Sequence, residues 1–178
     1  METILIAVVC IALILFGALT LSQVTLSSTD EISTAWRQME DNSGDISRTE
    51  ITSLGAETQS AGSIVEMTLQ NTGETKLRSF DKWDVIIEYH DDPNNDIFIK
   101  RLPYTEGALG DNLWIVEGIY LDAGTGSPEV FEKGILNPDE EMVIQMQLSP
   151  TILATTTNKV TVSTPNGVSA SAIFIGTP

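Results

Sequence analysis

Cysteine, histidine and basic residues are scarce in this chain of 178 residues, and each shortage argues against a class of protein. One cysteine cannot form a disulfide bond within the chain, so the fold is not a small scaffold held by disulfides. One histidine excludes metal sites built from several histidines and argues against a catalytic triad. Nine Lys and Arg residues against 25 Asp and Glu residues give a net charge of −16, which argues against nucleic acid as a partner.

Charged residues are also absent between Glu2 and Asp30. The first part of this gap, Ile4 to Leu19, reads ILIAVVCIALILFGAL and is called the apolar run below. A helix through the whole gap would be about 40 Å long, enough to cross a hydrocarbon core of about 30 Å. Because the apolar run has no polar side, it must be buried all round. Lipid and a bundle of identical helices would each bury it, and the sequence leaves both open.

Two other interpretations of the apolar run fit its residues less well. A secretory signal peptide begins with basic residues, whereas only Met1, Glu2 and Thr3 precede the run. The same lack of basic residues weakens an ordinary signal anchor. Lipidation would need Cys10 at the mature N-terminus, so we interpret Cys10 as a small apolar side chain within a helix.

The helical pattern continues beyond the apolar run with apolar residues three or four positions apart. These residues are Leu21, Val24, Ile32, Ala35, Trp36 and Met39. A stop signal follows at Asn42-Ser43-Gly44, with Gly44 as the expected C-cap. The sequence therefore predicts one helix from about Thr3 to Asn42, and two domains comprising residues 1–44 and 45–178.

From about Ile46 onward, apolar and polar residues alternate, which is typical of strands with one buried face. Turn signals separate the alternating segments, and Asn166-Gly167 predicts a hairpin. The predicted strands are residues 48–54, 65–70, 83–89, 97–102, 113–121, 142–148, 160–163 and 168–175. The fold class is thus α+β, with a long N-terminal apolar helix followed by an antiparallel immunoglobulin-like β-sandwich.

Candidate sites in the second domain are few. The densest polar cluster is the loop that contains Asp91, Asp92, Asn94 and Asp96, whose oxygens suit a calcium ion but whose spacing is not that of an EF-hand; a solvated turn is the alternative. Carboxylate pairs such as Asp81/Asp84 and Glu140/Glu141 arise by chance among so many acids. Trp83 and Trp114 are expected to be core aromatics rather than ligand platforms. Because no catalytic or phosphate-binding motif occurs, we predict no enzyme activity, cofactor, metal or small-molecule substrate.

Several segments in combination resemble a known family. They are the helix ILIAVVCIALILFGAL, the strand and turn LQNTGETKL, the segments FDKWDVII and GILNPDEEMVIQMQLSP, and the closing KVTVSTPNGVSASAIF. Together they resemble the archaellins, the type IV pilin-like subunits of the archaeal motility filament. Position five is Leu5, where bacterial type IV pilins have glutamate, and this favours the archaellin branch.

The resemblance implies an extracellular filament, with packed N-terminal helices in its core and the sandwich on its surface. The implied partners are other copies of the chain, the membrane before assembly, a prepilin-type peptidase that removes a basic leader, and the assembly motor at the filament base. The residues expected to mediate polymerisation are Ile4, Leu5, Val8, Ile11, Leu15 and Leu19. Three alternatives stay open: a membrane-anchored accessory protein that binds the cell envelope, a subunit of an adhesion pilus, and a bacterial source with the same machinery.

Overall fold

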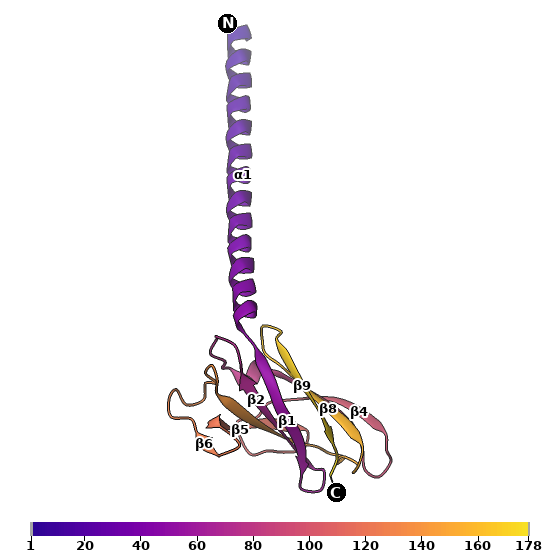
Figure 1. The fold of residues 1–178 in the computed structure, drawn as a ribbon. Coiled ribbons are helices and arrows are strands. Elements are labelled where there is room, and N and C mark those ends of the chain that lie inside the picture. Colours follow the sequence, from indigo (N-terminus) through magenta and orange to yellow (C-terminus); the bar gives the residue numbers. More distant parts are fainter. Residues whose placement is uncertain (1, 178) are drawn as a thin grey trace. The chain divides into compact units, whose positions relative to one another are not determined.

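The computed structural model describes residues 2–177, except for the side chains of Glu2 and of residues 21–30. Contacts divide the chain into two compact units, Met1–Gly44 and Asp45–Pro178. The first unit is a single helix, and the second contains all of the described strands (Figure 1).

Helix α1 (Glu2–Arg48) is longer than predicted. We expected its end at Asn42 with Gly44 as C-cap, and that prediction was wrong because the helix runs through Gly44. Its last turn is stabilised locally, since Arg48 pairs with Asp45 at 3.0 Å and the Thr49 hydroxyl donates to the Asp45 carbonyl at 2.7 Å. These contacts offset the cost of a glycine inside a helix, which is about 1 kcal/mol relative to alanine.

The strands of the second unit form two antiparallel sheets. The five-stranded sheet has the order β1-β2-β7-β5-β6, and its strands are β1 (Ile51–Gln59), β2 (Ile64–Asn71), β7 (Glu141–Gln147), β5 (Leu113–Asp122) and β6 (Ser127–Pro128). The four-stranded sheet has the order β4-β3-β8-β9, and its strands are β4 (Ile97–Leu102), β3 (Asp84–His90), β8 (Thr157–Ser163) and β9 (Ser169–Ile175). A short 3-10 helix, η1 (Phe80–Lys82), precedes β3.

This strand order confirms the predicted immunoglobulin-like sandwich. Without the short β6, the first sheet has the A-B-E-D order of such domains, and the second has C, F and G with one added edge strand. All eight predicted strands are present, although β1 begins at Ile51 because residues 45–48 complete the helix. Strand β6 was missed because two residues carry no periodic signal.

One apolar core lies between the two sheets. Strands β2 and β7 direct every second side chain into it, which explains the alternation in their sequences. Trp83 and Trp114 are both buried, which confirms that they are core aromatics. The other large buried side chains include Met67, Leu69, Ile87, Tyr89, Met142, Ile144, Met146 and Phe174.

The hairpin predicted at Asn166-Gly167 joins β8 to β9. Ser163 pairs with Ser169, and the Thr164 amide donates to the Val168 carbonyl at 2.8 Å. Gly167 adopts a φ of 89°, a conformation that glycine reaches without strain. The prediction of a hairpin at this position is confirmed.

The segment after the helix is held by the turn that follows β2. The Glu74 amide donates to the Arg48 carbonyl at 2.8 Å, and the Gly73 amide donates to the Glu50 carbonyl at 3.0 Å. A Cβ atom at position 73 would lie only 2.6 Å from the Arg48 oxygen. Gly73 is therefore required for the close approach of these two backbone segments.

Candidate assembly surface on the apolar helix

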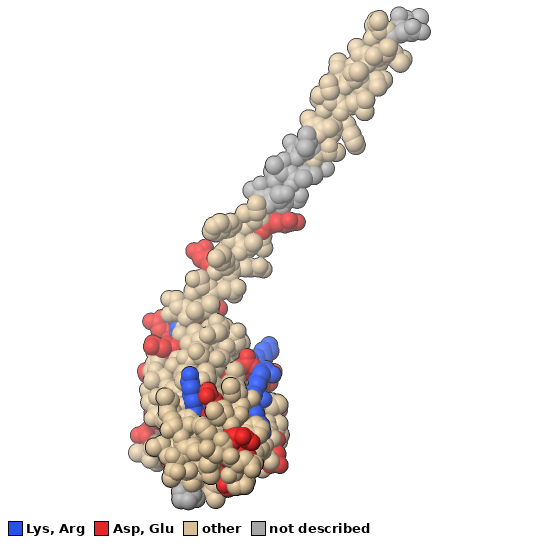
Figure 2. Space-filling model, turned by 90° about the vertical axis from the view of Figure 1, so that its right-hand side faces the viewer, with Lys and Arg blue, Asp and Glu red and all other residues tan. Residues whose placement is uncertain are grey.

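Every residue of the apolar run except the half-buried Gly17 is exposed in the isolated chain. The six residues expected to mediate polymerisation keep between 57% and 69% of their surface accessible; they are Ile4, Leu5, Val8, Ile11, Leu15 and Leu19. The span Thr3–Thr20 is long and apolar enough to cross a membrane, with a mean hydropathy of 2.8 and no buried residue. On the side drawn in Figure 2, the described part of this span shows no charged side chain.

Five of the six predicted residues share one helical face. Ile4, Val8, Ile11, Leu15 and Leu19 follow each other at spacings of three or four, so the helix aligns them in a narrow stripe. Leu5 lies beside that stripe. The remaining faces are equally apolar and exposed, with Ile6, Val9, Leu13, Ile14 and Phe16. The helix thus offers contacts in all directions, as a helix surrounded by other helices requires.

Further along α1, a second set of exposed apolar side chains was not among the predicted polymerisation residues. Ile32, Trp36 and Met39 are spaced by four and three residues and lie on one face. Trp36 keeps 68% of its surface exposed, which is unusual for so large an apolar group. Their helical spacing in the sequence is the signal by which they could have been included. With these residues, the candidate assembly surface has two parts. The apolar run is apolar on all of its faces, and the later part of the helix adds a stripe along one face only.

The predicted cation loop is organised around Asp91, which is buried. Its carboxylate accepts a bond from the Asp96 amide at 2.6 Å and another from the Asn94 side chain at 3.0 Å. Asp92 is exposed and contributes its backbone amide to Thr151. Among the described residues, no three acidic, histidine or cysteine side chains are grouped as a metal site requires. The carboxylate of Asp91 holds the turn together, and the cation site stays a prediction.

The carboxylate pairs also have structural roles. Asp84 forms an ion pair with Arg101, and the Glu141 carboxylate accepts a bond from the Ala123 amide at 2.8 Å. Glu140 is buried, and one of its oxygens accepts bonds from both the backbone and the side chain of Asn137, at 2.8 and 3.1 Å. None of these arrangements pairs an acid with a base beside an open site.

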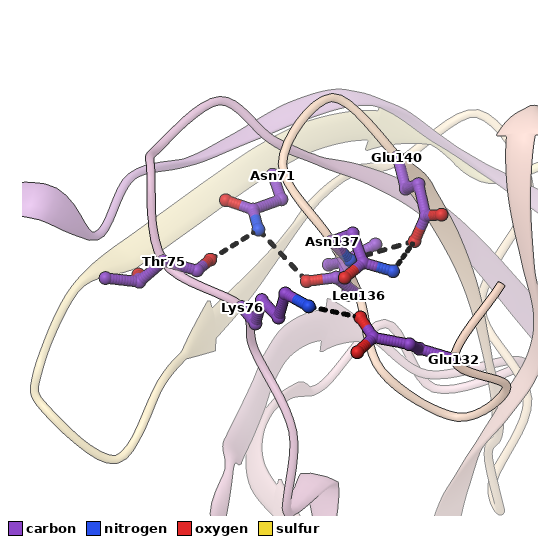
Figure 3. Close-up of polar contacts among 7 residues, drawn as sticks. All are labelled: Asn71, Thr75, Lys76, Glu132, Leu136, Asn137 and Glu140. Atoms are coloured by element: carbon purple, nitrogen blue, oxygen red, sulfur yellow. Dashed lines mark hydrogen bonds and ion pairs between the residues drawn. The ribbon is translucent and has the colours of Figure 1, made fainter.

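Figure 3 shows the polar cluster that contains Glu140. Asn71 is fully buried, and its side-chain amide donates to the carbonyls of Thr75 and Leu136 at 2.8 and 3.0 Å. An ion pair between Lys76 and Glu132 lies nearby. Burying an amide costs free energy unless its hydrogen bonds are made, and here both are made. The cluster therefore holds the turn after β2 to the segment before β7 and stabilises the fold.

No protein-family model matches the chain, and no curated protein matches its sequence. Solved structures do match. The archaellum periplasmic stator protein FlaG from Sulfolobus acidocaldarius has a TM-score of 0.50 and 21% identity, over 71% of this chain and 99% of that chain. The archaeal flagellum of Methanospirillum hungatei strain JF1 has a TM-score of 0.58 and 10% identity, over 96% of this chain and 91% of that chain. The fold is that of archaellum proteins.

The archaellum fold confirms the predicted resemblance at the level of structure. The flagellum chain matches over 96% of the protein, a share that has to include most of α1. FlaG also matches, with the same TM-score of 0.50, in its complex with FlaF from Sulfolobus acidocaldarius. The match to FlaG covers 71% of the protein. The flagellum chain thus shares most of the helix with this chain, together with the sandwich.

Proposed function

We propose that this protein is the structural subunit of a helical extracellular motility filament, an archaellum, and that its apolar helix forms the filament core. One observation carries the proposal: the span Thr3–Thr20 is apolar on all faces and has no buried residue in the isolated chain. Such a surface needs lipid or other apolar helices to cover it. The archaeal flagellum match, which includes most of α1, supports other helices as the final cover.

Packing between helices is the decisive energetic term in this proposal. Removing the apolar run from water would contribute tens of kcal/mol at about 25 cal/mol per Å². A subunit that arrives from a membrane gains much less, because lipid is already apolar. Assembly then depends on how well neighbouring helices fit, so one charged side chain in the run is expected to prevent it.

The proposal assigns a place to each domain. Residues 1–44 lie in the membrane before assembly and in the filament core afterwards, and residues 45–178 form the surface. A prepilin-type peptidase and an assembly motor are the proposed partners at the base. Catalysis is not part of the proposal, and the carboxylates of Asp84, Glu140 and Glu141 bond to groups of their own fold.

The test is to place a carboxylate inside the apolar run with Leu15→Asp. An unpaired carboxylate among packed helices costs several kcal/mol, so filaments should be lost while the sandwich stays folded. Negative-stain electron microscopy detects the filaments, and circular dichroism detects the sandwich. Wild-type filament yield from this variant would contradict the proposal.

A matched control places the same change in the sandwich. Leu121 lies on β5 with 52% of its surface exposed, so Leu121→Asp adds one negative charge without burying it. We expect filaments of normal yield from this variant. Equal loss in both variants would show that added charge, rather than its place in the helix, prevents assembly.

A second candidate function is a membrane-anchored accessory protein of the archaellum that binds the cell envelope. It is favoured by the match to FlaG, a periplasmic stator protein, over 99% of its length. In that case the apolar helix would remain in lipid. Shearing of cells separates the two candidates, since a filament subunit dominates the sheared material and an anchored protein stays with the membranes.

A further inference from the structure

The outward side of the four-stranded sheet carries an unexpected number of exposed apolar side chains. Five isoleucines on it keep between 41% and 72% of their surface accessible. We call this surface the isoleucine face; its residues are Ile86, Ile97, Ile99, Ile173 and Ile175. Isolated exposed apolar residues are ordinary, but five on one side of a single sheet are an accumulation that suits an interface.

Strand register arranges four residues of the isoleucine face in two rows that run across the sheet; the fifth, Ile86, lies outside these rows and pairs with Arg101 and Thr161. In the first row, Ile99 pairs with Glu88, Glu88 with Lys159, and Lys159 with Ile173. The same register continued by two residues gives a second row, which begins at Ile97 and His90 and ends at Thr157 and Ile175. Each row therefore has an isoleucine at both ends and polar residues in the middle.

This order is self-complementary. Consider a second copy of the sheet that is stacked face to face on the first and related to it by a two-fold axis parallel to the strands. This rotation reverses the order of the strands across the sheet and keeps each row at the same level along them. Ile99 then lies opposite Ile173 of the other copy, and Ile97 lies opposite Ile175. In the centre, Glu88 of each copy lies opposite Lys159 of the other. Two-fold contacts of this type use the same surface on both copies.

The charges select this orientation. A two-fold axis perpendicular to the strands would place Glu88 opposite Glu88 and Lys159 opposite Lys159, and juxtaposed like charges disfavour an interface. Among the described residues, neither Glu88 nor Lys159 takes part in an ion pair within its own chain. Both are exposed and point outward. Glu88 and Lys159 are neighbours across strands β3 and β8, and in this arrangement each also lies opposite the other charge of the second copy.

We propose that the isoleucine face binds a second copy of this chain, face to face, about a two-fold axis parallel to strands β3 and β8. The two sheets stack at the usual separation of about 10 Å with nearly aligned strands. Only the two edges of the face are apolar and its centre is polar, so we expect the association to be weak and reversible. A closed two-fold contact does not propagate along a filament. The pairing is thus independent of the proposed core helix contacts, and it joins free subunits or neighbouring filaments.

Cross-linking of the full-length protein in detergent tests the geometry. One chain carries Ile99→Cys and another carries Ile173→Cys, both with Cys10→Ser so that no other thiol is present. A short bismaleimide spans the ~10 Å between stacked sheets. An equimolar mixture should give cross-linked dimers, whereas each variant alone should not, because positions of the same kind lie about three strand spacings, ~14 Å, apart sideways. Equal cross-linking in the single variants, or none in the mixture, would overturn the proposal.

Charge reversal tests the chemistry of the pairing in the same assay. Adding Lys159→Glu to both cysteine chains brings four carboxylates together at the centre of the interface, those of residues 88 and 159 in each copy. This repulsion should reduce the yield of cross-linked dimer about tenfold or more. Adding Glu88→Lys as well exchanges the two charges and should restore the yield. Persistence of the dimer with Lys159→Glu alone, or failure of the exchanged pair, would contradict the assigned contacts. Filament formation by the same variants is expected to be normal, so this proposal and the filament proposal fail separately.

Discussion

The helix and the sandwich are both rich in apolar residues, yet they place them in opposite environments. In the sandwich, Met67, Leu69 and Ile144 are fully buried because the second sheet of the same chain covers them. In the helix, Leu13, Ile14 and Phe16 each keep about two thirds of their surface exposed. The sandwich therefore completes its own core, whereas the helix leaves its apolar side chains exposed. In the proposed function, the same residue types serve folding in one region and assembly in the other.

The largest expected effect comes from placing a carboxylate in each region. Ile144→Asp buries an unpaired charge between the sheets, and we expect the sandwich to unfold because this costs several kcal/mol, a large part of a domain's stability. Ile11→Asp should leave the sandwich unchanged and abolish filaments. Thermal unfolding followed by circular dichroism in detergent measures the first effect. A cooperative transition with the wild-type midpoint in Ile144→Asp would contradict the difference that we infer between the two regions.

A smaller but more quantitative contrast uses leucine truncation. Leu69→Ala removes a fully buried side chain and should lower the free energy of unfolding of the sandwich by about 2–5 kcal/mol. Leu13→Ala removes a side chain that is 66% exposed in the isolated chain and should leave that free energy unchanged. Urea denaturation gives both values. Equal losses would mean that the helix contributes to the stability of the sandwich.

Two glycines sharpen the comparison at the level of the backbone. Gly73→Ala forces a methyl group against the Arg48 carbonyl, so we expect a loss of roughly 1–3 kcal/mol in the sandwich. Gly44→Ala meets no atom within 4 Å and should favour the helix by up to about 1 kcal/mol. Urea denaturation measures the first change and far-ultraviolet circular dichroism the second. The account would be wrong about Gly73 if alanine were tolerated there without loss.

The sandwich is also expected to lose stability in alkali, unlike the helix. Burial and the nearby Asp91 raise the pKa of Tyr89 from 10.0 to about 12 in the folded protein. The native state therefore holds this proton more tightly than the unfolded state, and the stabilisation is complete below pH 10 and lost as the pH rises to about 12. Tyr89→Phe should flatten this pH dependence, as measured by urea midpoints. An unchanged slope in that variant would assign the effect to other groups.

The smallest expected effect concerns the net charge of −16, all of which lies outside the apolar run. Like charges on neighbouring subunits repel over a Debye length, about 30 Å at 0.01 M salt and 3 Å at 1 M. Filament stability should therefore rise modestly with salt. Light scattering during heating at both salt concentrations measures it. A fall in stability with salt would show that attractive ion pairs dominate between subunits.

Periodicity predicted most of this fold but not its interruptions. The alternation in β2, β7 and β9 reflects one buried face, so these strands were predictable. The end of the helix was not, because Gly44 looks like a stop signal and the contacts of Asp45 that carry the helix onward depend on the folded turn. Two-residue β6 has no pattern of its own and exists only through pairing with β5.

The candidate surfaces were predictable to different degrees. The all-round apolar character of the run is visible in its sequence alone. The isoleucine face could not be predicted as a whole from the sequence. Ile86, Ile173 and Ile175 did give a signal, because they stand at positions where the alternation of their strands would place polar residues. Their alignment with Ile97 and Ile99 needed the strand register. The Asp91 loop shows the opposite case, because its acidic sequence resembles a cation site while its carboxylate bonds to its own turn.

The most direct test of the division between folding and assembly is to remove residues 1–26 and examine the shortened chain by electron microscopy and thermal unfolding together. The account predicts a soluble β protein with a cooperative unfolding transition and no filaments. Filaments of native diameter from the shortened chain would contradict it, because the apolar run would then not be the core of the assembly.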